Sequence, residues 1–579
     1  MNLAKFMKYV DDAVSEMTEE QITAFVHEIA RTLPESQRSH FIKTLKSVKA
    51  EKNAADNRKD PTLDEVELLH RDIGRVTKFL DAVAEGDLRL DSEIDYQYTN
   101  RWGWDDDECE FIYSDPEDIL PTINKAIGLL HRCIDLEAYP EGAELARNLF
   151  CLTVDVDGDY NDYDEYPLQI DDLFNEELLD GTYEDFVHEA LYLIYVGNGL
   201  SERPAILYNY LSGLSYANIK LEDIMQVGDR DLPDFDGFLS LWIEYLGKQN
   251  ESKSNDLLNE ALSMTGEDQY LEAARKFSDI HPELYKKILQ NGMSGQDDAA
   301  MMKIGQEALE KIGEMSVLRG EIALLSADYA NKINSKETAE HCWLEAFRSN
   351  PSVENYLRLR FFSTNYEKIS AAVRQIYEDR YAGKENRGFD SDRKKSYCAI
   401  LFFEKRFNEV MKLGLSEPNA LGWTYTFMKE GLALFFLLLF RGENVPRGIR
   451  EMHISALHWM NFDSNKFLSG TTYANEENPE EIFWQSFATW KSNIDIPAED
   501  YDDWMDKIRG QLSKRTEGIM RASRTKYYGE CAAFIAAYGE VWESNGISRA
   551  KARIMEEYRN EYPRRRNFIQ ALRTYGMPR

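Results

Sequence analysis

Apolar residues recur at helical spacing along most of the chain, and the pattern is clearest between residues 319 and 363. A first predicted helix there carries residues of one face, three and four positions apart: Ile322, Leu325, Ser326 and Tyr329. A second predicted helix combines small residues, which let helices approach, with large ones that fill the space between them: Ala339, Trp343, Ala346 and Phe347. Asn334 and Ser335 fit the turn, and Asn350 with Pro351 closes the second helix. The stretch therefore predicts a pair of antiparallel helices.

This helical pair resembles the tetratricopeptide pattern, with one residue inserted at the turn. A hairpin of this kind cannot bury its apolar faces alone, so the resemblance implies neighbours stacked on either side. We therefore predict an all-α fold: an α-solenoid of degenerate tetratricopeptide-like helical hairpins, with a small N-terminal helical module.

The predicted parts of the chain follow shifts in composition and pattern. A polar stretch that ends at Pro61 reads as a linker, because it lacks the apolar residues of a packed element. The predicted parts are an N-terminal helical module (1–47), the linker (48–62), an acidic helical region with an irregular loop (63–190), helical repeats (191–318), tetratricopeptide-like repeats with an apolar core helix (319–441) and a C-terminal helical region (442–579).

Individual elements can also be predicted. The segment 86–115 reads as a long structured loop or a short hairpin, and 461–480 as a polar, irregular connection. Two long helices are expected over 512–575, with Gly546 between them and Pro563 kinking or splitting the second. Further helices are expected at 63–85, 117–136, 141–153, 367–380, 392–403 and 421–441.

The longest apolar run, 432–440, is LALFFLLLF. As a helix its residues span about 14 Å, whereas a bilayer core needs about 30 Å. We therefore predict a buried helix and no membrane partner.

Charge is distributed very unevenly along the 579 residues, whose formal net charge is −35. Residues 81–190 contain 32 Asp and Glu against 5 Lys and Arg, while residues 509–579 contain 15 basic and 7 acidic residues. A field of this sign repels nucleic acid and attracts basic surfaces. The expected partner is therefore a basic protein, and the charge is compatible with a monomer or a dimer.

The six cysteines are widely spaced, and the sequence has no CxxC or CxC pair. This pattern favours reduced thiols in the core of a cytoplasmic protein over a disulfide framework or a zinc ribbon. Met1–Lys8 lacks the apolar core of a signal peptide, so secretion is not expected.

Known catalytic motifs are missing from the sequence. It has no GxxxxGK[ST] phosphate loop, no HExxH metal pair and no GxSxG nucleophile elbow. His453 and His458 would project about 140° apart on a helix, and the adjacent His341 and Cys342 would point apart. We therefore predict no catalytic, cofactor-binding or metal-binding residues.

Two acidic clusters stand out as candidate partner-binding residues. The first joins tryptophans to carboxylates: Trp102, Trp104, Asp105, Asp106 and Asp107. The second is Asp155, Asp157 and Asp159, which fall at positions one, three and five of an EF-hand register. That register fails at Tyr160, where glycine is needed, and at Tyr166, where a bidentate glutamate is needed. A solvated acidic loop between helices is the preferred interpretation of the second cluster.

The C-terminal part carries a second resemblance. Its residues are Tyr528, Ala532, Ala533, Tyr538, Gly546, Ala550, Tyr562 to Arg566, Phe568 and Leu572. This series resembles the end of bacterial helical-repeat proteins that are often attached to a SWIM zinc finger, and the resemblance extends over 320–579. The finger needs a CxC pair followed by CxH, and this chain has neither. A zinc or nucleic-acid role is therefore not implied; what the resemblance implies is a scaffold.

Three hypotheses follow. The first is a non-enzymatic protein–protein interaction scaffold whose acidic surface recruits a basic protein partner. The second is an enzyme whose site is assembled from scattered residues, with the Trp102 cluster as its centre. The third is an acidic mimic of nucleic acid that occupies a basic groove.

Overall fold

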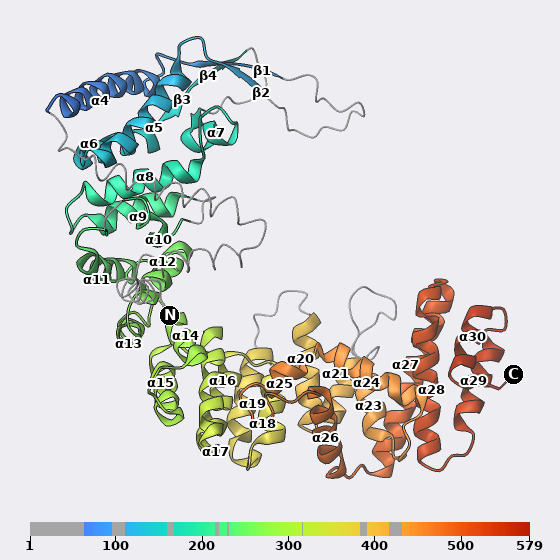
Figure 1. Cartoon of the computed structure of the whole chain (residues 1–579). Helices are drawn as coiled ribbons and strands as arrows, with labels where there is room; N and C mark the ends of the chain where they lie inside the picture. The colour runs from blue at the N-terminus through green and yellow to red at the C-terminus, as the bar shows by residue number, and fades with distance from the viewer. Residues whose placement is uncertain are drawn as a thin grey trace, which may run out of the picture. The chain divides into compact units, whose positions relative to one another are not determined.

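The computed structural model describes residues 63–94, 111–158, 167–214, 219–228, 231–314, 316–382, 391–415 and 431–578. The predicted N-terminal module and its linker lie outside these ranges. The chain divides into two units, Met1–His281 and Pro282–Arg579. Helices make up most of both units, which agrees with the predicted helical class (Figure 1).

The helices of the first unit are α4 (Leu63–Ala84), α5 (Ile119–Asp135), α6 (Tyr139–Phe150), α7 (Ile170–Asn175), α8 (Tyr183–Val196), α9 (Arg203–Gly213), α10 (Leu221–Ile224), α11 (Phe235–Leu246), α12 (Ser252–Ser263) and α13 (Glu267–Lys276). Helix α4 packs on α5 and α6, and α8 packs on α5, α6 and α9. Leu69, Val76, Leu80 and Val83 recur at helical spacing and are buried, which explains how α4 docks. The helices predicted at 63–85 and 117–136 are confirmed, and the one predicted at 141–153 is present but begins at Tyr139 and ends at Phe150.

Two small sheets depart from the all-α prediction. One has the order β2–β1–β4, built from β1 (Leu90–Ile94), β2 (Phe111–Ser114) and β4 (Val156–Gly158). Strand β1 pairs antiparallel with β2 and parallel with β4. The other sheet pairs β3 (Thr153–Val154) with β5 (Leu168–Gln169). In the described part of 86–115, β1 and β2 thus pair as the two strands of a hairpin would, while the connection 95–110 lies outside the described residues.

The structure corrects the prediction for the acidic stretch that begins at Asp155. We expected a solvated loop, but the part that is described, up to Gly158, belongs to a sheet. Leu90 N–H donates to the Asp155 carbonyl at 3.0 Å, and β4 continues that pairing. Leu152 and Val154 are buried, and they hold this backbone against the rest of the unit although the neighbouring aspartates are polar.

The helices of the second unit are α14 (Glu283–Asn291), α15 (Asp298–Lys311), α16 (Val317–Lys332), α17 (Lys336–Ser349), α18 (Val353–Phe362), α19 (Tyr366–Ala382), α20 (Ser391–Phe403), α21 (Phe407–Leu415), α23 (Leu432–Leu439), α24 (Arg447–Met460), α25 (Ser464–Leu468), α26 (Pro479–Ser492), α27 (Ala498–Arg521), α28 (Tyr528–Ser544), α29 (Ala550–Glu561) and α30 (Arg566–Thr574). A 3₁₀ turn, η2 (Thr525–Tyr527), precedes α28.

The hairpin predicted at 319–363 is confirmed as α16 and α17, which pack against each other. Asn334 adopts φ 57° in the turn, a left-handed conformation that asparagine tolerates better than most residues. Ser326 and Ala346 are fully buried. Ala346 of α17 lies against Gly320 of α16, whereas Ser326 of α16 lies against Gly305 of α15. Phe347 packs on Tyr356 of α18, with ring centroids 6.1 Å apart. Helix α16 also packs on α14 and α15, and α17 on α18.

The apolar run is confirmed as the buried helix α23, in which every residue from Leu432 to Leu439 is buried. It packs on α24 and α28. In the part of the chain that the structure describes, no helix is long and apolar enough to cross a membrane.

The C-terminal helices begin and end at other residues than predicted. Residues 512–521 belong to α27, which begins at Ala498. Gly546, with φ 92°, ends α28 as predicted, and the chain around Pro563 separates α29 from α30. Proline removes a backbone donor and clashes with the preceding turn, so of the two predicted effects it splits the helix.

Among the described cysteines, Cys133, Cys342, Cys398 and Cys531 are buried, as predicted. Cys151 is free but exposed, which corrects the prediction for this residue. It follows the last turn of α6, where the chain leaves the helix for β3.

A buried carboxylate ties three C-terminal helices together. Glu540 on α28 accepts hydrogen bonds from the backbone N–H groups of Gly448 (3.3 Å) and Ile449 (2.9 Å) at the start of α24. Lys551 Nζ on α29 lies 3.0 Å from the same side chain. A Cβ at position 448 would lie 2.6 Å from Glu540 Oε2 and 2.7 Å from the Ala537 nitrogen, so this approach requires glycine.

We predict that Glu540→Ala lowers the free energy of unfolding by about 3 kcal/mol, because it leaves two helix N–H groups and a lysine without their acceptor. Chemical denaturation followed by circular dichroism measures this. The control is Glu476→Ala, which removes an exposed carboxylate and is expected to change the free energy of unfolding by less than about 0.5 kcal/mol. Equal effects of the two variants would contradict the role given to Glu540.

Candidate functional site

The structure places only two of the eight candidate partner-binding residues. Six lie outside the described residues: Trp102, Trp104, Asp105, Asp106, Asp107 and Asp159. Asp155 immediately precedes β4 and is half-buried, whereas Asp157 lies within β4 and is exposed.

Strand pairing gathers acidic side chains on one face of the three-stranded sheet. The parallel register sets Asp157 of β4 beside Asp91 of β1. Glu93 lies two residues farther along β1 and therefore on the same face as Asp91. All three side chains are exposed. Like charges on neighbouring strands repel each other, so this face attracts cations.

A cleft of about 610 Å³ in the second unit offers a more enclosed site. It is bounded by α14, the exposed side of α16, the first turn of α18 and the segment 463–474, which we call the strap. The residues that line it are Lys286, Gln290, Val317, Gly320, Glu321, Leu324, Leu325, Asp328, Asn350, Ser352, Glu354, Asn355, Lys466, Ser469 and Ala474.

The cleft combines apolar and charged side chains. Val317, Leu324 and Leu325 lie on one face of α16, which also carries Glu321 and Asp328, and Val317 is 60% exposed. Lys286 of α14 pairs with Glu321. An apolar surface with a few placed polar groups is the usual composition of a binding site.

Asp328 is the cleft's unusual carboxylate. Burial raises its pKa to about 6, although Lys332, Arg358 and a backbone hydrogen bond from Gly470 all act in the opposite direction. It therefore titrates just below neutral pH, and a cation placed beside it would hold it ionised. Such a carboxylate is suited to pairing with a basic group.

The strap lies across α16, α17 and α18, which donate hydrogen bonds to its backbone carbonyls, and its Phe467 and Leu468 side chains are buried. Trp343 Nε1 and Asn331 Nδ2 both donate to the Gly470 carbonyl, at 2.6 and 2.8 Å. Gly470 adopts φ 73°, and a Cβ there would lie 3.1 Å from the Leu324 carbonyl oxygen. The hairpin thus binds a short chain segment by its main-chain groups.

Arg358 provides the other anchor of the strap and is fully buried. Its Nε donates to the Phe467 carbonyl at 3.2 Å, and a second guanidinium nitrogen donates to the Lys466 carbonyl. Burial lowers the pKa of Arg358 to about 9, with Glu354 and Asp328 acting in the opposite direction, so it remains cationic at neutral pH. Glu354 in turn accepts a hydrogen bond from the backbone of Asp463 at 3.1 Å.

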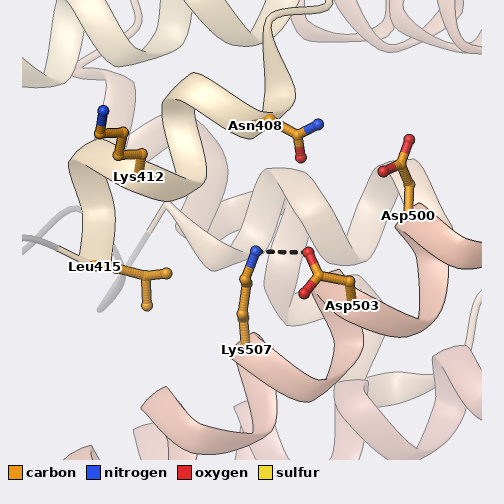
Figure 2. Close-up of a pocket in the computed structure, with 6 residues that line it drawn as sticks. All are labelled: Asn408, Lys412, Leu415, Asp500, Asp503 and Lys507. Atoms are coloured by element: carbon orange, nitrogen blue, oxygen red, sulfur yellow. Dashed lines mark hydrogen bonds and ion pairs between the residues drawn. The ribbon is translucent and has the colours of Figure 1, made fainter.

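A second recess, of about 630 Å³, lies between α21 and α27 (Figure 2). Its lining residues are Asn408, Lys412, Leu415, Asp500, Asp503 and Lys507. Lys507 and Asp503 point toward each other and form an ion pair at 2.5 Å. Asn408 accepts from the indole of Trp504 at 2.8 Å. Its two lysines and two aspartates balance, so it offers less electrostatic discrimination than the Asp328 cleft.

Within the described ranges, no cluster of three or more His, Cys, Asp or Glu side chains is placed to hold a metal ion. His453 faces the Ile449 carbonyl of its own helix at 3.0 Å and packs edge-on to Trp484. Burial lowers its pKa. Its environment is that of a packed core residue.

Comparison with protein families and with curated proteins gave no match. The resemblance to bacterial helical-repeat proteins therefore stays a prediction.

Sequence reasoning missed both the strap and Asp328. The segment 461–480 read as an irregular connection, yet Phe467 and Leu468 are an apolar pair within it, and both are buried. Apolar residues inside a polar connection are a signal that the connection packs onto something. Which surface receives it depends on contacts more than 100 residues apart in sequence.

We predict that Arg358→Leu releases the strap and lowers the free energy of unfolding by about 3 kcal/mol, because buried carbonyls lose their charged donor. Hydrogen exchange measured by mass spectrometry should become faster over 463–474 than in the wild type. Arg450→Leu, at an exposed position of α24, serves as the matched control. Unchanged exchange in the strap would contradict the role given to Arg358.

Proposed function

We propose that the protein is a non-enzymatic interaction scaffold that recruits a basic protein partner, and that the Asp328 cleft binds a segment of that partner. The observation that carries the proposal is the position of Asp328: a carboxylate largely withdrawn from water, in a cleft that Val317, Leu324 and Leu325 also line. A segment that combines a lysine or arginine with an apolar side chain matches both features.

The way the strap is bound supports the proposal that the ligand is a peptide. The same helical hairpin already holds residues of the strap through carbonyl groups, which every peptide possesses. The cleft adjoins this contact, because Lys466, Ser469 and Ala474 of the strap line it. A partner segment would lie beside the strap and use side chains for specificity.

The charge of the chain supports a basic partner. Glu321 and Glu354 line the cleft together with Asp328, and the first unit presents Asp91, Glu93 and Asp157 on its sheet. The net charge of −35 speeds encounter with cationic surfaces and disfavours anionic ones. Stacked hairpins of the expected α-solenoid would add the extended surface that scaffolds use, and a cytoplasmic location belongs to the same proposal.

In the first test, a blocked ten-residue peptide of alternating arginine and leucine is titrated into the protein, and isothermal titration calorimetry measures the affinity. The wild type is expected to bind it, and a peptide with glutamate in place of arginine is not. Asp328→Asn should weaken binding about tenfold, or about 1.4 kcal/mol. Asp502→Asn, an exposed change in the same unit, is the control. Equal affinity of both variants would exclude the cleft.

The second test measures how the affinity for the peptide depends on pH. Since the pKa of free Asp328 is about 6, a cationic peptide binds the ionised form and must displace a proton at lower pH. Affinity is therefore expected to rise from pH 5 to pH 7 and to level off above that. The charged groups that act on Asp328 are Lys332 and Arg358, of which Arg358 stays cationic throughout this range. The other charged residues that line the cleft are Lys286, Glu321, Glu354 and Lys466. Asp328→Asn should flatten the profile; a rise that persists in this variant would contradict the assignment.

A further inference from the structure

A separate pocket of about 440 Å³ lies between the end of α18, the turn joining α20 to α21, and one face of α26. Its lining residues are Arg360, Phe361, Phe362, Lys405, Tyr473, Ile482, Gln485, Ser486, Thr489, Trp490 and Asn493. The contributions of α26 follow a spacing of three and four residues, so a single helix face forms one wall.

The aromatic walls of this pocket are fixed by packing. Phe362 lies against Tyr473, with ring centroids 5.5 Å apart. Trp490 is held by its indole N–H, which donates to the Phe403 carbonyl at 3.2 Å. Phe361 packs edge-on to Phe403. The pocket therefore has preformed surfaces for an apolar or planar group.

Its charge is opposite to that of the chain. Arg360 and Lys405 line the pocket, and no Asp or Glu does so among the residues that the structure describes. Lys405 Nζ donates to the Asn493 carbonyl at 3.3 Å, which places the ammonium beside the end of α26. In a chain with a net charge of −35, a pocket with two cations and no carboxylate in its described lining selects for anions.

Arg360 has an unmet hydrogen bond. Its guanidinium lies over the ring of Tyr366, 4.5 Å from the centroid, and its buried Nε–H has no acceptor within the described part of the chain. A buried donor on a charged group costs free energy when it is unpaired.

Glu404, the carboxylate that precedes Lys405, is already engaged. It accepts the Tyr356 hydroxyl at 2.7 Å and also the Tyr366 hydroxyl. Glu481, on α26, is exposed and accepts from Gln485 at 3.1 Å. Both carboxylates thus have partners and do not line the pocket.

We propose that this pocket binds an organic carboxylate whose oxygens accept from Arg360 and Lys405 and whose apolar or aromatic body packs on Phe361, Phe362 and Trp490. The volume suits a ligand of small-molecule size or one terminal residue of a peptide. The site is distinct from the Asp328 cleft and takes the opposite charge, so it does not depend on the proposed function.

The test uses two pairs of probes with the full-length protein: 3-phenylpropionate with its amide, and a hexapeptide ending in phenylalanine with a free or an amidated C-terminus. Calorimetry measures affinity, and indole fluorescence provides a second readout. Each free carboxylate is expected to bind at least tenfold more tightly than its matched amide. A tighter 3-phenylpropionate complex identifies a free small acid as the ligand type, and a tighter peptide complex identifies a chain terminus.

Arg360→Met should weaken carboxylate binding at least tenfold, with Arg450→Met as the matched control on an exposed helix face. If Arg360→Met lowers the midpoint of thermal unfolding, two other variants test the proposal instead. Arg360→Lys should retain part of the affinity for the carboxylate, and Lys405→Met should lose it. Absence of saturable binding, equal affinity for acid and amide, or unchanged affinity in these variants would overturn the proposal.

Discussion

The second unit depends on one electrostatic and hydrogen-bonding constraint: a buried guanidinium needs carbonyl oxygens as hydrogen-bond acceptors. Arg358 is fully buried on α18, and it meets this requirement with the carbonyls of Lys466 and Phe467. The strap is thereby pinned across the α16–α17 hairpin, where Trp343 and Asn331 complete the contact. A charge withdrawn from water destabilises the fold unless it is paired, so the strap and α18 stabilise each other.

Both candidate sites of this unit are bordered by the strap. Lys466 and Ser469 close one side of the Asp328 cleft, and Tyr473 contributes an aromatic ring to the Arg360 pocket. The two sites have opposite electrostatics because α16 presents carboxylates while the end of α18 and the α20–α21 turn present cations. One segment without long helices therefore borders two surfaces of different charge.

Helices were largely predictable from sequence because their signal is local. The hairpin at 319–363, the buried run at 432–440 and α4 each follow from apolar spacing, and the structure confirms them. The short strands were harder, because β4 has three residues and owes its existence to pairing with β1. Asp155 and Asp157 looked like loop residues for the same reason: charge is visible locally, but a strand partner is not.

The sites were less predictable than the fold. Asp328 is one of 103 acidic residues, and only its burial among α16, α18 and the strap distinguishes it. Arg360 similarly stands out only because its donor is buried. Burial of a polar group arises from tertiary contacts, so composition pointed to a basic partner without indicating the cleft.

The most direct measurement of the central claim is hydrogen exchange of the whole protein with and without the arginine–leucine peptide. The account predicts slower exchange in α14, α16 and the strap when the peptide is bound, with α27 to α30 unchanged. Protection confined to residues 81–190, or no protection anywhere, would contradict a partner site at Asp328.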